Sequence, residues 1–228
     1  MNKGKNKILA AGLALLIAVG VGSANALLTD NRVNVIEGKV GDLSIKADTE
    51  TVIDGKGVIA EQENLKFTSK LQANGNKSSD VKLRYAVEAF DKEGKPLDLN
   101  GVAPFSLKVR VGDKEYVDGK DGVKITEEVK DNRAVYTLSG TPFVLDGKHS
   151  EEKHEEDGIY GDNFTVNASL VLKKESADVV NGGKFETQVL TEIKQHRNST
   201  DDDWEKLSID DVFLTNGSVK AVPEKDKK

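Results

Sequence analysis

The sequence contains three histidines, His149, His154 and His196, whose imidazoles are the side chains best suited to acid–base or metal chemistry near neutral pH. Two of them lie in the segment Asp146–Asp157, which also carries four glutamates, Glu151, Glu152, Glu155 and Glu156. Imidazole and carboxylate groups are good zinc ligands, so a metallopeptidase centred on His149 and His154 is one hypothesis. Their five-residue spacing does not place them on one helical face, and charged runs are usually solvated. We therefore predict no metal site and interpret the segment as a solvated loop.

The motifs of secreted hydrolases are missing. The chain has no Gly-x-Ser-x-Gly elbow and no His-Glu-x-x-His zinc motif. It has no cysteine, which excludes disulfides, thiolate zinc sites and a cysteine nucleophile. The run Asp201–Asp203 lacks the alternating Asp-x-Asp-x-Asp-Gly layout of a calcium loop. We predict a protein that is not an enzyme and that holds no cofactor.

The charge balance argues against a nucleic-acid partner. The chain carries a formal net charge of -6, and its first 26 residues contain Lys3, Lys5 and Lys7 but no acidic residue. Removing these three positive charges leaves a net charge of -9 on the remainder. An acidic chain without a basic stripe interleaved with aromatic residues repels phosphate. We therefore expect no binding to DNA or RNA.

The N-terminus has the three-part pattern of a secretory signal peptide. Basic residues in Met1–Lys7 precede the fourteen apolar or glycine residues Ile8–Val21. Ala24 and Ala26 then supply small residues at the −3 and −1 positions of a peptidase site. We predict a signal peptide over residues 1–26, with cleavage between Ala26 and Leu27.

A membrane anchor is the alternative interpretation of this apolar run. Fourteen helical residues span only about 21 Å, whereas the hydrocarbon core of a bilayer is about 30 Å thick. We therefore expect a secreted protein, extracellular or at the cell surface, that contacts a membrane only through the uncleaved signal peptide.

Residues after the signal alternate between apolar and polar side chains, which is typical of half-buried strands. The clearest run extends from Val81 to Phe90, with Val81, Leu83, Tyr85, Val87 and Ala89 on one face and Lys82, Arg84 and Glu88 on the other. Similar alternation occurs in Leu43/Ile45/Ala47, Leu65/Phe67/Ser69/Leu71, Phe105/Leu107/Val109/Val111, Phe164/Val166/Ala168/Leu170/Leu172 and Phe185–Ile193. In the last run, Phe185, Val189 and Ile193 are expected inward and Glu186, Gln188 and Glu192 outward. Six strands, each with one solvated face, require two sheets packed face to face.

Turn signals such as Asn74-Gly75, Asp121-Gly122 and Asn181-Gly182 separate these runs. The predicted fold is an all-β, antiparallel two-sheet sandwich of jelly-roll type over residues 37–222, followed by the charged tail 223–228. A short C-terminal helix is also expected, with a cap at Ser199 or Thr200, Asp201–Asp203 in its first turn, and Trp204 and Leu207 on one face. A strand over Val212–Val219 is an alternative for this region.

The segment Leu27–Ile36 becomes the N-terminus after the predicted cleavage. Its apolar anchors are Leu28, Val33, Val35 and Ile36. An unpaired strand of this kind can insert at a sheet edge of a second copy, as in donor-strand complementation. It can equally pair within its own chain as an ordinary edge strand, and the sequence leaves both alternatives open.

Three stretches resemble the TasA/camelysin family. These are Leu27-Leu28-Thr29-Asp30 followed by Asn34, the strand Gly38–Ile45 (GKVGDLSI), and the closing run Val189–Asn198 (VLTEIKQHRN). The resemblance implies a jelly-roll subunit of extracellular biofilm-matrix fibres in a bacterium. It also implies a head-to-tail polymer of this chain, with other matrix proteins as further partners, and it favours exchange of Leu27–Ile36 between copies. Some members are described as metallopeptidases, but this chain has no zinc-protease motif.

Two other functions remain open from the sequence. A monomeric surface adhesin or glycan-binding sandwich requires an exposed aromatic platform, and Trp204, Tyr116, Tyr136 and Tyr160 are too scattered in the sequence to identify one. The metallopeptidase hypothesis rests on His149, His154 and their neighbouring glutamates, and is the least favoured of the three.

Overall fold

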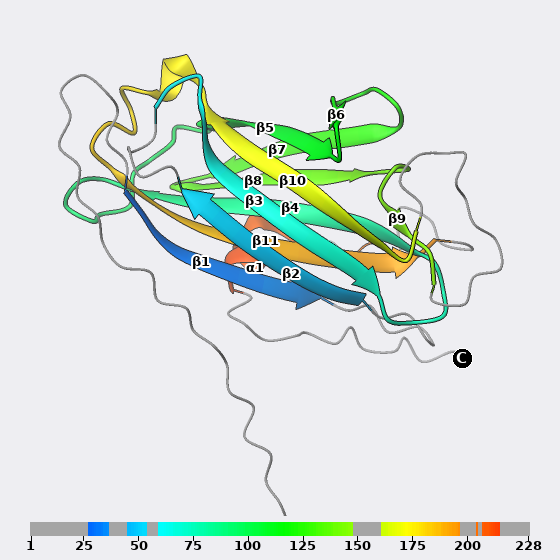
Figure 1. The fold of residues 1–228 in the computed structure, drawn as a ribbon. Coiled ribbons are helices and arrows are strands. Elements are labelled where there is room, and N and C mark those ends of the chain that lie inside the picture. Colours follow the sequence, from blue (N-terminus) through cyan, green and yellow to red (C-terminus); the bar gives the residue numbers. More distant parts are fainter. Residues whose placement is uncertain are drawn as a thin grey trace, which may run out of the picture.

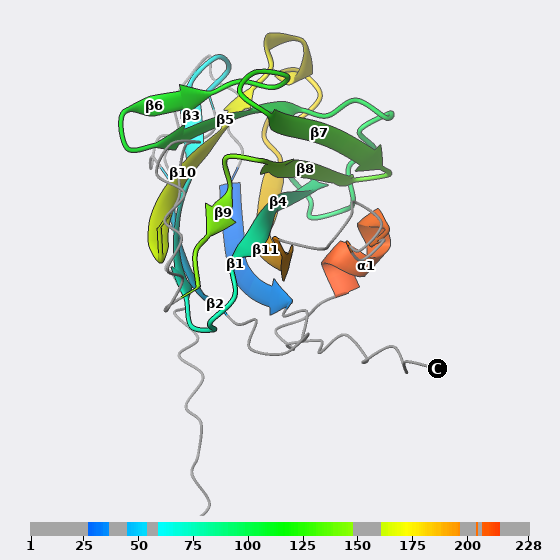
Figure 2. The same cartoon turned by 90° about the vertical axis from the view of Figure 1, so that its right-hand side faces the viewer.

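The protein folds as two β-sheets packed face to face (Figures 1 and 2). The computed structural model describes residues 27–36, 45–53, 59–147, 161–196, 204 and 207–214, with the backbone alone described over 27–36. The predicted signal peptide, most of the charged segment Asp146–Asp157 and the tail 223–228 lie outside the described residues.

The first sheet contains the N-terminal strand at one edge. Its order is β1 (Leu27–Ile36), β11 (Lys184–Gln195), β4 (Ser79–Phe90), β8 (Arg133–Gly140) and β7 (Val123–Lys130), and the short β9 (Val144–Leu145) also pairs with β4. The second sheet has the order β2 (Ile45–Ile53), β3 (Glu63–Ala73), β10 (Asn163–Leu172), β5 (Phe105–Val111) and β6 (Lys114–Tyr116). A 3-10 turn, η1 (Lys174–Ser176), and one helix, α1 (Ile209–Leu214), complete the described elements.

The predicted all-β, two-sheet sandwich is confirmed. The chain passes repeatedly between the sheets, for example from β3 to β4 and from β10 to β11, so that residues distant in sequence form each sheet. Among the described strands, every pairing is antiparallel except that of β1 with β11, which is parallel. β1 therefore differs from the other edge strands in the direction of its pairing.

Aromatic rings fill the space between the two sheets. The centroids of Phe105 and Phe185 lie 5.0 Å apart and those of Phe67 and Tyr85 lie 5.1 Å apart, so each pair joins opposite sheets. Phe105 also packs edge-on against Tyr136, and its backbone N–H donates a hydrogen bond of 2.9 Å to the Tyr136 hydroxyl. These contacts help to bury most of the inward positions of the alternating runs.

The predicted turn at Asp121-Gly122 forms as expected. Both residues have positive φ angles, 52° for Asp121 and 73° for Gly122, which is the conformation that such a pair adopts readily. The turn places Gly122 against Gly140. A Cβ atom added to Gly140 would lie 2.1 Å from the Gly122 carbonyl oxygen. Gly140 is therefore required by the close approach of the two backbones as well as by its φ of 128°.

The expectation of one solvated face per strand is wrong for β4 and β11. Gln188 and Glu192 lie on the outer face, yet their exposed fractions are only 5% and 3%. The reason is that α1 covers the outer face of the first sheet: Ile209 and Val212 pack there against Ala86, Val135 and Leu190. An outward position is therefore not a solvated position in this sheet.

The C-terminal helix exists, but its predicted start is wrong. It begins at Ile209, and Trp204 lies in a bend rather than in the helix. Ser208 caps it: the Asp211 N–H donates to the Ser208 hydroxyl at 3.3 Å, and the Ser208 N–H donates to the Asp211 carboxylate at 3.0 Å. The alternative strand over Val212–Val219 is contradicted where the structure describes it, because Val212–Leu214 is helical.

The two fully buried tyrosines provide a matched test of the core. We expect Tyr136→Phe to lower the free energy of unfolding by about 1–3 kcal/mol, because the buried Phe105 N–H loses its acceptor. Tyr85→Phe should change it by less than about 1 kcal/mol, because the Tyr85 hydroxyl makes no hydrogen bond of good geometry. Urea denaturation of both variants checks this, and equal losses would contradict it.

The same residues predict a loss of stability in alkali. Burial raises the pKa of Tyr85 and of Tyr136 above the ordinary value near 10, and hydrogen bonding opposes this only in part. Above about pH 10 the unfolded chain releases phenolic protons that the folded chain retains, so the free energy of unfolding should fall by about 1.4 kcal/mol per pH unit for each tyrosine. Denaturation series between pH 8 and 11 should show a shallower fall in the double Phe variant than in the parent.

Candidate functional site at the edge held by β1

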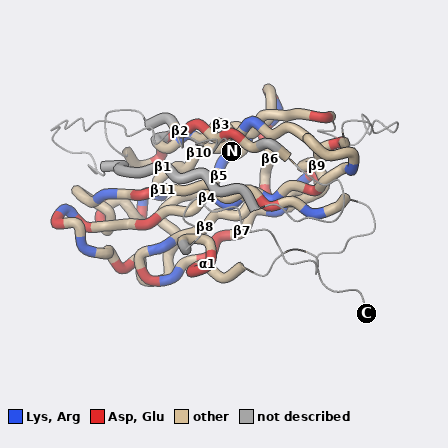
Figure 3. The backbone as a smooth tube through the Cα atoms, turned by 90° about the horizontal axis from the view of Figure 1, so that it is seen from below, with Lys and Arg blue, Asp and Glu red and all other residues tan. Residues whose placement is uncertain are grey.

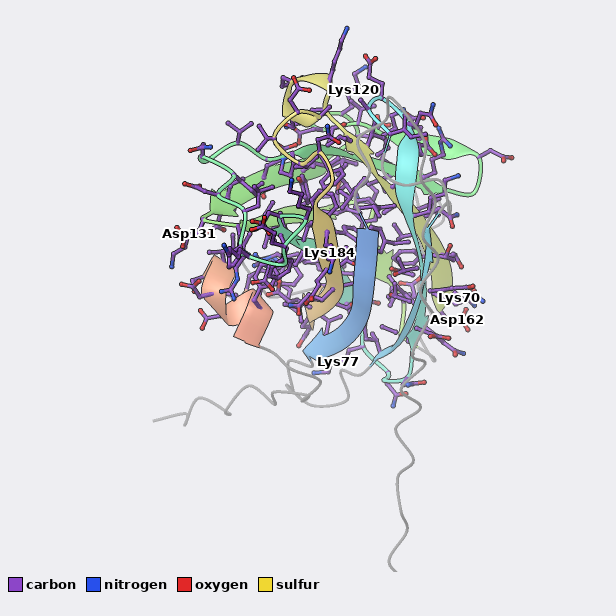
Figure 4. The ribbon with its side chains drawn as sticks, turned by 90° about the vertical axis from the view of Figure 1, so that its left-hand side faces the viewer. Lys70, Lys77, Lys120, Asp131, Asp162 and Lys184 are labelled. Atoms are coloured by element: carbon purple, nitrogen blue, oxygen red, sulfur yellow. The ribbon has the colours of Figure 1, made fainter. Side chains whose placement is uncertain are left out.

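The strand β1 occupies the edge of β11 within the same chain. Its register runs from Leu27 opposite Lys184 to Ile36 opposite Glu192, and Figure 4 shows Lys184 beside the start of β1. This is the second of the two alternatives that the sequence left open, in which the segment pairs within its own chain. The structure contains one copy of the chain, so exchange between copies remains a prediction.

Three of the four predicted anchors stand opposite the core. Leu28 is the register partner of Phe185 and Val33 that of Val189, and both partners are buried between the sheets. Val35 stands opposite Thr191, which is fully buried. The fourth anchor, Ile36, stands opposite Glu192 on the outer face of the sheet. The spacing of the anchors therefore matches the inner row of β11 at three positions.

The register contains one irregularity. Between Leu28 and Asn31 the pairing advances three residues on β1 but only two on β11, so β1 carries one extra residue there. On its other side β1 approaches β2, the edge strand of the second sheet. The strand β1 thus lies between the edge of β11, from Lys184 to Glu192, and the inner side of β2. We call these two surfaces together the β1 seat.

The outer side of the β1 seat contains a buried ion pair that the sequence analysis missed. Nε of Arg84 lies 2.5 Å from a carboxylate oxygen of Glu192, and the two side chains are 10% and 4% exposed. The Gln188 side-chain amide donates to the backbone carbonyl of Val212. The only sequence signal was the presence of two apolar residues, Ala86 and Leu190, at outward positions.

Trp204 continues the cover that α1 provides on the outer face of the first sheet. The ammonium groups of Lys82 and Lys194 lie 4.1 and 5.0 Å from the centre of its ring. Lys194 also lies 3.6 Å from the Asp80 carboxylate. Both lysines are only 9% exposed, and the indole ring lies against their ammonium groups.

Ion pairs that are exposed or half-buried connect α1 to β7 and β8. Asp210 contacts Lys130 and Arg133, and Arg133 also lies 2.9 Å from Glu88. The hydrogen bond from Lys130 lowers the pKa of the Asp210 carboxyl, and the same contact raises the pKa of Lys130. Because Lys130 and Asp210 are solvated, their pair orients the helix more than it stabilises it.

The candidate catalytic and processing residues lie mostly outside the described residues. This applies to His149, His154, their four glutamates, and Ala24 and Ala26 of the predicted cleavage site, whereas Leu27 is the first residue of β1. His196 is described: its Nδ1 lies 2.5 Å from the Asp80 carboxylate. Within the described residues, no three His, Asp or Glu side chains are grouped as metal ligands would be.

The aromatic residues considered for glycan binding do not form a platform in the described part of the chain. Tyr116 and Tyr136 are buried in the core, and Trp204 is partly covered where it packs on the two lysines. Tyr160 lies outside the described residues. Stacking on a sugar requires an exposed ring face, which neither buried tyrosine offers.

Comparison with protein-family models, with curated proteins and with solved structures found no match to this chain. In the described ranges, no helix has both the length and the hydrophobicity needed to cross a bilayer.

Because the Arg84–Glu192 pair is buried, we expect even a conservative substitution at Glu192 to lower the stability strongly. Glu192→Gln should lower the free energy of unfolding by about 3–5 kcal/mol, because it leaves the Arg84 charge buried without a counter-charge. The double variant Arg84→Met/Glu192→Leu should lose much less, because no buried charge remains. Glu93→Gln is the matched control at an exposed pair with Lys95 and should change stability by less than about 1 kcal/mol. Comparable losses at the buried and exposed pairs would contradict the assignment.

Proposed function

We propose that the protein is a secreted structural subunit that polymerises head to tail into extracellular biofilm-matrix fibres by donor-strand exchange of Leu27–Ile36. The observation that supports this best is the position of β1. It begins directly after the predicted cleavage site and is the outermost strand of its sheet. Its pairing with β11 is also the one parallel pairing among the described strands. The β11 edge of a second copy would offer it the same hydrogen bonds.

The cost of moving β1 is lower than that of moving a central strand. Among the described strands, β11 is its single hydrogen-bonded neighbour, and parallel pairing is slightly less stable per residue than antiparallel pairing. Eight residues, 37–44, separate β1 from β2 in the sequence. When extended they reach up to about 30 Å, which allows β1 to contact a neighbouring copy while the sandwich stays folded.

Exchange of this kind produces a filament. The strand of one copy and the β11 edge of the next are different surfaces, so the contact is heterologous and does not close. Burial of the three anchors that stand opposite the core, Leu28, Val33 and Val35, would contribute roughly 5–9 kcal/mol before the cost of ordering the strand. The self-paired strand makes the same contacts, so this burial slows dissociation of an assembled fibre and does not by itself favour the fibre over the monomer.

Processing would control assembly. The signal peptide over residues 1–26 directs the chain to the outside and holds Leu27–Ile36 at the membrane until cleavage after Ala26 releases it. In this function the protein has no enzymatic activity and holds no cofactor. Its partners are further copies of itself and other matrix proteins. These partners do not include nucleic acid. Basic and acidic residues are interspersed over the described backbone (Figure 3), so no continuous basic surface attracts phosphate.

Engineered cysteines can distinguish exchange from self-pairing, because the natural chain contains none. Protein recovered from the culture medium should begin at residue 27. In the variant Leu27→Cys/Lys184→Cys, which joins register partners, oxidised fibres should run as a ladder of covalent multimers on a non-reducing gel.

Each single-cysteine variant serves as the control and should give dimers at most. Fibres identified by electron microscopy whose cysteine pair closes within one chain would contradict strand exchange. Persistent monomers across salt, pH and seeding conditions would contradict the fibre function itself.

A further inference from the structure

Threonines line the inner side of the β1 seat. On β11, Thr187 and Thr191 alternate with Val189, and on β2 the inward residues include Thr49 and Thr51. The inward rows of the strands farther from β1 carry no threonine in the described residues: they contain Val81, Leu83, Tyr85 and Val87 on β4, Phe105, Leu107 and Val109 on β5, and Phe164, Val166, Ala168 and Leu170 on β10. The inward threonines of the described strands are therefore concentrated on β11 and β2, the two strands that β1 contacts.

Two of these hydroxyls are buried without a partner. Oγ1 of Thr51 and Oγ1 of Thr191 are inaccessible to solvent and accept or donate no hydrogen bond in the described residues. The neighbouring Thr49 differs, because its hydroxyl donates to Oγ of Ser69 at 3.0 Å. A buried hydroxyl that lacks a partner opposes burial, since water would satisfy it.

For Thr191, the free-energy cost of the unpartnered hydroxyl depends on the presence of β1. Thr191 stands opposite Val35 in the register and is fully buried while β1 is in place. Withdrawal of β1 opens the edge of β11 and lets water reach the inner row. A seat lined with hydroxyls loses less hydrophobic stabilisation on opening than a seat lined with aliphatic residues, and it gains hydrogen bonds to water.

We infer that the unpartnered hydroxyls of Thr51 and Thr191 promote release of β1 from its own seat, and thereby set the rate at which it exchanges with the β1 of a second copy. The exchange partner rests on the proposed function. The release of β1 does not, because it is a property of a single chain.

Threonine-to-valine substitutions test the inference, because valine has nearly the same shape but no hydroxyl. In Thr51→Val and Thr191→Val, the backbone amides of 27–36 should exchange hydrogen for deuterium about tenfold more slowly than in the parent. Thr49→Val is the matched control on the same strand and face. It should leave that exchange unchanged or accelerate it, because it removes a hydroxyl that is hydrogen-bonded to Ser69.

Exchange is measured by mass spectrometry on monomeric protein purified from its producing cells, and fibre growth is followed separately by light scattering. Slower amide exchange together with a similar slowing of growth supports the inference. Exchange at the parent rate in both valine variants overturns it. Slower amide exchange with an unchanged rate of fibre growth overturns the link between strand release and assembly. Slower exchange without fibres in any protein, the parent included, supports strand release and refutes the proposed function instead.

Discussion

The burial of β11 on all sides is the constraint on which the rest of the structure depends. β4 and β1 bond its two edges, the aromatic core packs on its inner face, and α1 packs on its outer face. A strand in this position can carry charge only where the charge is paired, and the Arg84–Glu192 pair meets that condition. β1 is the neighbour at the end of the sheet, and the inner row of β11 that it faces alternates the core residues Phe185 and Val189 with Thr187 and Thr191.

The strands that the sequence predicted correctly are those whose alternation is set by one solvated face. In β3, β5 and the first half of β10 the positions between the core residues are exposed or half-buried, so the polar pattern survives in the sequence. In the second half of β10, Ser169 and Val171 are buried as well. β11 was only half predicted, because the residue that shields Gln188 lies 24 positions later in the chain, at Val212. Such long-range cover leaves almost no local signal. The strands β7 and β8 were not predicted, although Ala134, Tyr136 and Leu138 alternate along β8.

The chemistry of the helix cap was predicted correctly but assigned to the wrong residues. Thr200 to Asp203 and Ser208 to Asp211 both have a hydroxyl residue followed three positions later by an acid. Local sequence cannot choose between them. Tertiary packing does, because Ile209 and Val212 after the second cap reach the apolar residues on the outer face of the first sheet. Similarly, the parallel direction of β1 could not be predicted, since an alternating pattern is the same for both directions of pairing.

The extra residue in β1 between Leu28 and Asn31 also bears on how copies would be spaced. A regularly paired strand can shift by two residues and keep the same side chains on the same face, so its axial position is degenerate. A bulge at one fixed place removes that degeneracy, because only one alignment matches the interruption to its partner. In a polymer built through this strand, every subunit would therefore sit at the same offset from the previous one, which is the geometric requirement for a constant helical repeat.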